Sequence, residues 1–118
     1  MIEIDSMQGG IIAVHFRGSV TNSELVFVAE IITGFDPCDG LLIFLDWLGI
    51  DRWVFGTPSA DDVSVWRGAA KGIRRVAIVH DRRMKRQAAW LAAILRQGGA
   101  DVRSWQPQRA GVAAAWLH

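Results

Sequence analysis

The sequence contains the residue types of a nucleophile, a base and an orienting acid, but no motif brings them together. The candidates for these roles are Cys38, Ser59, His15, His80, Asp46 and Asp81. A nucleophile needs a base within hydrogen-bonding distance, and elbow motifs such as G-x-S-x-G supply that geometry. Because no such motif frames these residues, we predict that the protein is not an enzyme.

Metal and nucleotide chemistry have no local support either. Three scattered histidines and one cysteine give no pair at the spacing of metal ligands. The glycines form neither the G-x-G-x-x-G pattern nor the P-loop pattern that cradles phosphates. We therefore expect no metal and no cofactor.

A basic cluster in the stretch VHDRRMKRQAAW is the strongest sign of an anion site. If Asp81 caps a helix, then Arg82, Arg83 and Arg86 point outward, with Trp90 one turn beyond Arg86 and within reach of a cation–π contact. The inward side of this helix is then formed by Met84, Ala88, Leu91 and Leu95. The arginines are either a solvated face or a site for an anionic headgroup, a phosphate or an acidic partner.

Charge is divided unevenly along the chain, although the net charge is only +1. Residues 1–66 hold ten of the twelve acids and two bases, and residues 67–118 hold eleven bases and two acids. Such blocks produce a dipolar surface that favours self-association or a charged partner. A net charge this small argues against general binding to nucleic acid.

The segment DWLGIDRWVFGTP, residues 46–58, is unusually apolar for a connection that shows no helical or strand period. Loops are usually polar, so an apolar loop must cover something. It either closes over the core or a dimer interface, or walls a hydrophobic pocket at the carboxyl ends of the strands. The predicted ligand-binding residues are Trp47, Leu48, Ile50, Trp53, Phe55, Trp66, Arg82, Arg83, Arg86 and Trp90.

The pattern of apolar residues predicts the element order ββαβαβαβα, with a hairpin followed by parallel β/α units. The predicted strands are 1–5, 11–18, 40–47, 74–81 and 100–105, and the predicted helices are 21–34, 59–72, 81–99 and 107–118. The fold class is therefore α/β, with a mixed sheet of about five strands and about four helices in a single domain, 1–118.

The first predicted helix has an apolar surface that is too wide for one neighbour. A capping box of Thr21 and Glu24 and a stop at Gly34 favour a helix, although the β-branched run LVFVAEII would also suit a strand. The core-facing positions are Leu25, Val28, Ala29 and Ile32, and the apolar arc continues over Val26, Phe27 and Ile31. We expect a second neighbour on this helix, either a partner subunit or an acyl-like ligand.

The cellular setting follows from composition. A single cysteine among 118 residues excludes an internal disulfide and indicates a reducing compartment. The start MIEIDSMQGG lacks the basic and apolar parts of a signal peptide. No run approaches the ~18 apolar residues of a membrane span. We expect a cytoplasmic protein without a transmembrane segment.

Several stretches resemble the SpoIIAA-like family, a bacterial relative of the STAS domains that include the anti-sigma factor antagonists. FRGSVTNSEL resembles its strand-to-helix entry, LLIFLDW its central strand, IRRVAIVHDRRMKRQAAWLAAIL its next strand and helix, and ADVRSWQPQRAGVAAAWL its closing segment. The resemblance implies a STAS-like α/β fold, often dimeric. It also implies a non-enzymatic module that binds a partner protein or, as in the similar CRAL-TRIO fold, a hydrophobic or amphipathic lipid-like ligand.

An alternative implied by the resemblance is a regulatory module controlled by phosphorylation. The anti-sigma factor antagonists carry a phosphorylated serine in the turn directly after the central strand. Here Asp46 ends the matching strand and no serine occupies that turn, so the first available hydroxyls are those of Thr57 and Ser59. A further alternative is a peripheral membrane contact made by tryptophans beside bases.

Overall fold

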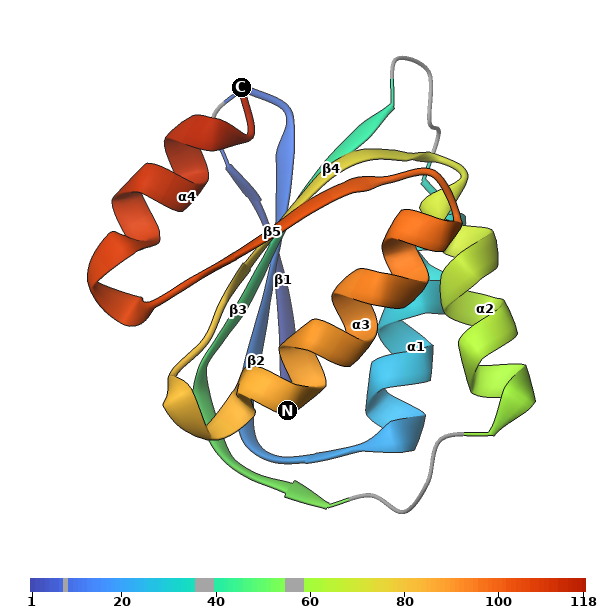
Figure 1. Ribbon diagram of the computed structural model, residues 1–118, viewed down its shortest axis with the longest axis horizontal. Helices are drawn as coiled ribbons and strands as arrows, with labels where there is room; N and C mark the ends of the chain where they lie inside the picture. Colours follow the sequence, from blue (N-terminus) through green and yellow to red (C-terminus); the bar gives the residue numbers. More distant parts are fainter. Residues whose placement is uncertain (8, 36–39, 55–58) are drawn as a thin grey trace.

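Five strands form one mixed sheet in which the strands follow one another in chain order (Figure 1). The strands are β1 (Ile2–Met7), β2 (Ile11–Thr21), β3 (Leu41–Val54), β4 (Ile73–Val79) and β5 (Asp101–Trp105). The first pair is antiparallel and the other three pairs are parallel. This computed structural model describes residues 1–7, 9–35, 40–54 and 59–118. It confirms the predicted hairpin and the parallel units that follow.

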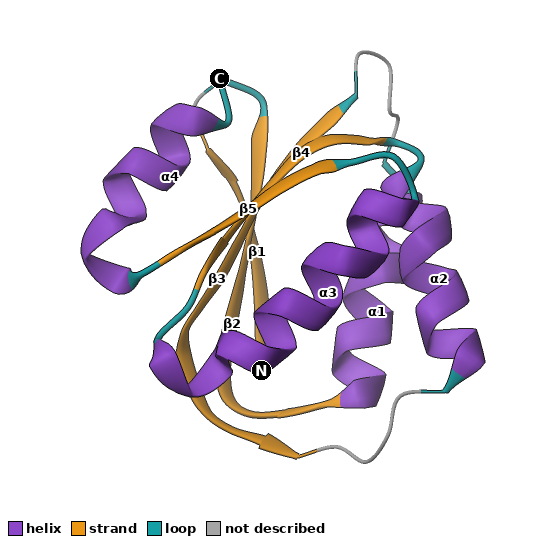
Figure 2. Cartoon of the chain, in the orientation of Figure 1, coloured by secondary structure: helices purple, strands orange, loops and turns teal. Residues whose placement is uncertain are grey.

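Three long helices cover one face of the sheet, and a short fourth helix packs on the other face (Figure 2). The first three are α1 (Asn22–Thr33), α2 (Ala60–Ala70) and α3 (Lys85–Gln97), with a 3-10 turn, η1 (Arg82–Met84), before α3. Crossovers between neighbouring parallel strands are right-handed, so crossovers that advance in one direction place their helices on the same face. None of the helices in the described part of the chain is long and apolar enough to cross a membrane.

The last helix, α4 (Ala110–Trp116), follows a 3-10 turn, η2 (Pro107–Arg109), and returns over the opposite face of the sheet. Two cores result. The larger core lies between the sheet and α1 to α3. The smaller core, under α4, is formed by Ile11, Ala13, Phe44, Ala77, Val79, Ala113 and Leu117.

Capping boxes set the starts of α1 and α2. The Thr21 hydroxyl accepts a hydrogen bond from the Glu24 N–H at 3.2 Å, and the Glu24 carboxylate accepts one from the Thr21 N–H. Ser59 and Asp62 make the same reciprocal pair at the start of α2. These local bonds satisfy donors that a helix start leaves free. They explain why residues 22–33 form a helix despite their β-branched run.

The apolar segment after Asp46 corrects one prediction, because Trp47 to Val54 is not a loop. β3 continues through it and pairs with the second half of β2, with Gly18 opposite Ile50 and Thr21 opposite Val54. The register shifts twice along this pairing, which breaks the simple alternation that sequence reading depends on. Phe55 and Thr57 lie outside the described residues.

Trp47 is central to the larger core. Its side chain is fully buried, with its ring at 6.0 Å from that of Phe16 and at 4.8 Å from that of Trp53, both edge-to-face. Gly49 allows the two strands to approach here, since a Cβ on it would lie 2.9 Å from the main-chain oxygen of Phe16. Leu48 lies between Trp47 and Gly49 in the sequence, and its side chain is 39% exposed.

This contrast gives a matched test of the extended strand. We expect Trp47→Ala to lower the free energy of unfolding by about 3–5 kcal/mol, because it empties a buried aromatic site. Leu48→Ala should cost less than about 1 kcal/mol, as for an exposed position. Urea denaturation followed by circular dichroism measures both. Equal losses in the two variants would contradict the placement of this segment.

Candidate functional site

The helices α1, α2 and α3 all begin at the edge of the sheet where β2, β3 and β4 end. Open α/β sheets bind ligands at this edge. The side chains that cap the helices here are already occupied, since Thr21, Ser59 and Asp81 each accept a hydrogen bond from a main-chain N–H of their own helix or turn. A site at this end must therefore be built from side chains other than these three.

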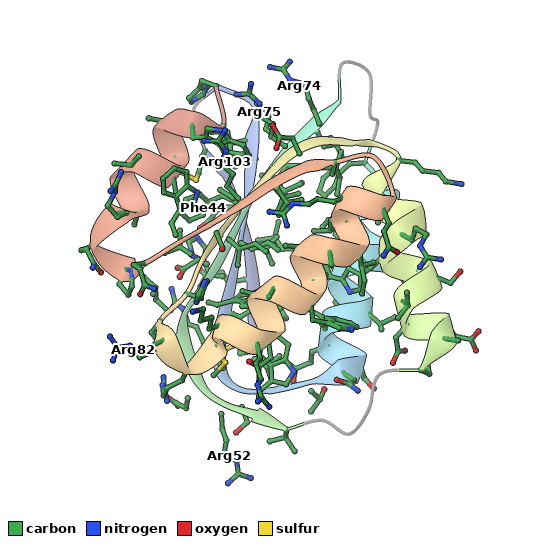
Figure 3. The ribbon with its side chains drawn as sticks, viewed as in Figure 1. Phe44, Arg52, Arg74, Arg75, Arg82 and Arg103 are labelled. Atoms are coloured by element: carbon green, nitrogen blue, oxygen red, sulfur yellow. The ribbon has the colours of Figure 1, made fainter. Side chains whose placement is uncertain are left out.

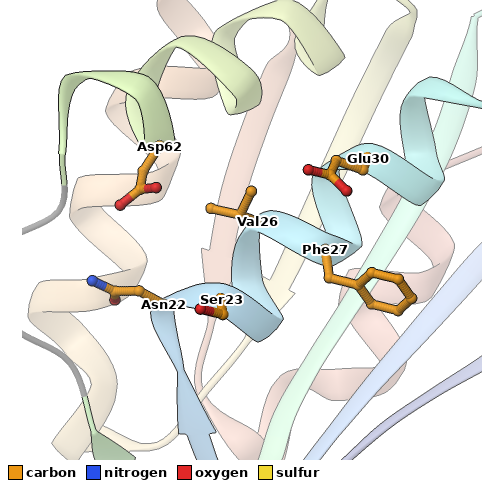
Figure 4. Close-up of a pocket in the computed structure, with 6 residues that line it drawn as sticks. All are labelled: Asn22, Ser23, Val26, Phe27, Glu30 and Asp62. Atoms are coloured by element: carbon orange, nitrogen blue, oxygen red, sulfur yellow. The ribbon is translucent and has the colours of Figure 1, made fainter.

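A hollow of about 430 Å³ lies between the first turns of α1 and α2 (Figure 4). It is lined by Asn22, Ser23, Val26, Phe27, Glu30 and Asp62. Figure 4 shows Asn22 and Asp62 facing each other across the opening, with Val26 between the two helices. Phe27 is the most exposed large apolar side chain of α1, at 54%. The hollow thus combines an apolar wall with a polar rim.

Two further hollows continue the first one along the same pair of helices. One of about 460 Å³ shares Glu30 with it and reaches Thr33, Val65 and Gly68. Another of about 140 Å³ shares Thr33 and Gly68 with the second and ends against Leu41. We call the surface formed by these three adjoining hollows the α1–α2 groove. Its length suits an elongated occupant better than a compact one.

The charge of the groove is acidic at one end. Glu30 and Asp62 line its first hollow, and Asp61 is exposed on the same turn of α2. Lys71 is the basic residue of the groove and lies in its second hollow, toward the end of α2. Coulomb attraction therefore favours an occupant whose bases meet Glu30 and Asp62.

Behind the groove, α1, α2 and α3 meet in a narrow apolar seam. The seam is lined by Leu25, Val26, Trp66 and Trp90, together with Asn22 and Asp62 at its mouth, and a water-sized sphere does not fit into it. Trp66 is fully buried and Trp90 is half-buried. The side chains fill this seam completely, so it is not a binding site. It forms the floor of the first hollow of the groove.

The residues of β3 that the sequence predicted to line a pocket do not line the α1–α2 groove. Trp47 and Ile50 are buried in the larger core, and Trp53 is half-buried against Trp47. Leu48 is exposed. The structure therefore separates these residues from the α1–α2 groove, while it brings Trp66 and Trp90 to the seam beneath that groove.

The basic cluster is also divided. Arg83 folds back onto β3, where its guanidinium donates to the main-chain oxygens of Ile50 at 3.0 Å and Asp51 at 3.1 Å. It also pairs with the Asp81 carboxylate at 2.9 Å. Arg82 and Arg86 are exposed, and Arg82 projects from the side of the molecule away from α1 and α2 (Figure 3). Arg83 thus connects β3 to the turn that precedes α3, and we call this connection the Arg83 tie. Because its guanidinium makes these contacts, Arg83 is not available as an anion receptor.

The expected contact between Arg86 and Trp90 is not among the cation–π contacts of the described residues. Those contacts place Arg75 and Arg103 over Trp116 and Arg109 over Trp105. Sequence reasoning missed them because the tryptophans and arginines come from different elements. The alternating arginine and tryptophan of β5 was the one local signal.

The structure also pairs two residues that the sequence presented separately. His15 Nδ1 lies 2.7 Å from the Asp46 carboxylate, and His15 Nε2 lies 3.6 Å from the Asp5 carboxylate. His15 and Asp46 are register partners on β2 and β3. Across the part of the chain that is described, no three potential metal ligands are grouped closely enough to hold an ion. The cluster links β1, β2 and β3 on the face that carries α4.

Comparisons with known proteins support the fold. No protein-family model and no curated protein matches the chain. A crystal structure of an uncharacterised DUF3478-family protein from Shewanella loihica, described as having a SpoIIAA-like fold, aligns over 100% of this chain and 93% of its own, with a TM-score of 0.63 and 16% identity. The chain therefore has a SpoIIAA-like α/β fold, which confirms the predicted fold class. At this identity the likeness concerns the fold alone.

The Arg83 tie predicts a dependence of stability on pH. The hydrogen bond from Arg83 is the main cause that lowers the pKa of Asp81 from its usual value. A carboxylate with a lowered pKa stabilises the folded state above its unfolded pKa of about 4, and this contribution is lost as the pH falls through the lowered value. Asp81→Asn should therefore destabilise the protein at pH 7, and the gap to the wild type should close under acid.

Urea denaturation at a series of pH values measures this gap. Asparagine still caps a helix start, so the variant isolates the charge. Asp101→Asn, at an exposed carboxylate that forms no ion pair with a described residue, is the control. If the difference in the free energy of unfolding between Asp81→Asn and the wild type stayed constant with pH, this would contradict a stabilising ion pair between Asp81 and Arg83.

Proposed function

We propose that this chain is a non-enzymatic interaction module that binds an apolar, basic helical segment of a partner protein in the α1–α2 groove. The observation that carries the proposal is an elongated groove with the exposed Phe27 on one wall and two carboxylates, of Glu30 and Asp62, at its rim. Amphipathic helices bind such grooves through apolar side chains one turn apart, and flanking charges set their orientation.

The form of the groove supports a protein partner over a small lipid-like ligand. Small-molecule sites usually bury most of the surface of the ligand in a concave, enclosed pocket. Here the hollows are open to solvent along two helices, and the seam beneath them is closed. A helical segment can use the full length of the groove, whereas a compact ligand would use only part of it.

Gly68 offers a way to block the groove without damaging the fold. It is exposed on α2 and lines two of the hollows, and a Cβ on it would meet no atom within 4 Å. Replacing a helical glycine by leucine also improves helix propensity by roughly 0.8 kcal/mol. We expect Gly68→Leu to raise the melting temperature while weakening the binding of a groove ligand by about tenfold or more.

A peptide-display selection against the wild-type protein supplies the ligand. Selected peptides should carry aliphatic or aromatic residues three and four positions apart, flanked by lysine or arginine. Their affinity, measured by fluorescence anisotropy, should fall with Gly68→Leu and with Glu30→Lys. The matched control is Gly111→Leu on α4, where a Cβ also has open space. Peptides without bases, or binding unchanged by Gly68→Leu, would argue against the proposal.

A second copy of the chain is the rival occupant of the exposed face of α1, because a homodimer is also predicted. Light scattering over a range of concentrations distinguishes the two. Dimerisation that Phe27→Asp abolishes, together with no selected peptides, would assign this face to self-association.

Phosphorylation at Ser59 is a second proposed function, favoured by the position of this residue. Ser59 is exposed at the start of α2, and its capping partner Asp62 lines the groove. A phosphate there would add negative charge beside an already acidic rim. We expect Ser59→Glu to strengthen the binding of basic peptides about two- to fivefold. Ser59→Gln is the uncharged control. Equal affinities for both variants would contradict a role for negative charge at position 59.

A further inference from the structure

The outer face of α4 forms a second surface with a different chemistry. α4 has the sequence AGVAAAW and carries no charged side chain. Ala113 is buried against the sheet, whereas Gly111, Val112 and Ala115 are exposed, with Val112 at 44%. An apolar outer face is unusual for the only described helix on its side of the sheet.

Two tryptophans and two arginines border this face. The rings of Trp105 and Trp116 lie 6.3 Å apart, and both side chains are partly buried against the smaller core. Arg103 lies over Trp116 at 5.1 Å, and Arg109 lies over Trp105 at 5.9 Å. Figure 3 shows Arg103 and Arg75 beside the end of α4. We call Arg103, Trp105, Arg109, Val112 and Trp116 the α4 surface.

The charges of this surface are not neutralised by the described part of the chain. Arg75 donates to the main-chain oxygen of Trp116 at 2.7 Å, so it holds the end of α4 in place. Neither Arg103 nor Arg109 forms an ion pair with any described carboxylate. Two exposed guanidinium groups therefore flank an apolar helix.

We propose that the α4 surface binds the face of an anionic lipid bilayer. A helix with an apolar outer side lies in the plane of the membrane interface. Arginines at the rim of such a helix are attracted by anionic headgroups. One short helix and two bases give weak, reversible association.

The geometry disfavours a nucleic acid on the same surface. Single-stranded nucleic acids bind by stacking their bases on exposed aromatic rings. Guanidinium groups already lie over the rings of both Trp105 and Trp116, where a base would have to stack. The exposed Val112 also offers nothing to a phosphate backbone.

Vesicle sedimentation tests the proposal. The full chain is mixed with vesicles of phosphatidylcholine containing 30% phosphatidylserine or with vesicles of phosphatidylcholine alone, at low salt and at 0.5 M NaCl. We expect binding to the anionic vesicles only, and its loss at high salt. The double variant Arg103→Gln/Arg109→Gln should bind about 30-fold more weakly, from about fivefold per base near an anionic surface. Val112→Asp should also reduce binding.

The control is Arg52→Gln/Lys85→Gln, which removes the same charge from exposed positions outside both proposed surfaces. Arg52 lies at the opposite end of the molecule from α4 in Figure 3. Melting curves confirm that each variant is folded before its binding is scored. Absence of binding to anionic vesicles would overturn the proposal, and so would an equal loss in the control. Binding to a soluble poly-glutamate peptide without binding to vesicles would also overturn it and assign the surface to an acidic protein.

Discussion

When parallel strands follow one another in chain order, the handedness of the connections fixes the side of the sheet on which the connecting helices lie. Each crossover is expected to be right-handed, and all three advance across the sheet in the same direction, so α1, α2 and α3 must share one side. The sheet then has one face covered by three helices, and in the described part of the chain α4 is the helix that covers the other face. Both surfaces to which we assign binding follow from this constraint.

On the crowded face, the helices cannot all lie directly on the strands. Figure 1 shows α2 farthest from the sheet, on the outer side of α1 and α3. Trp66 compensates for this displacement, because its buried ring fills the seam that α2 forms with α1 and α3. The groove remains on the solvent side of that seam. Small residues such as Gly68 and Ala69 line it there, and they leave space that larger side chains would fill.

On the other face, α4 is too short to cover the whole sheet. The uncovered part carries the cluster of Asp5, His15 and Asp46, while the covered part is apolar around Phe44. Arg75 secures the end of α4 through main-chain oxygens, while Arg103 and Arg109 at its border lie over the rings of Trp116 and Trp105.

The sequence by itself determined the elements and their order, because the signals involved are local. The Thr21 and Ser59 capping boxes mark helix starts, and the spacing of Met84, Ala88, Leu91 and Leu95 marks the buried side of α3. Only the tertiary structure decided which distant residues meet. The extension of β3 depends on pairing with β2 across two register shifts, and the contact of Arg83 with the Ile50 carbonyl joins residues 33 positions apart. Hydrogen bonds and packing between separate elements have no period along the chain, so a single sequence cannot reveal them.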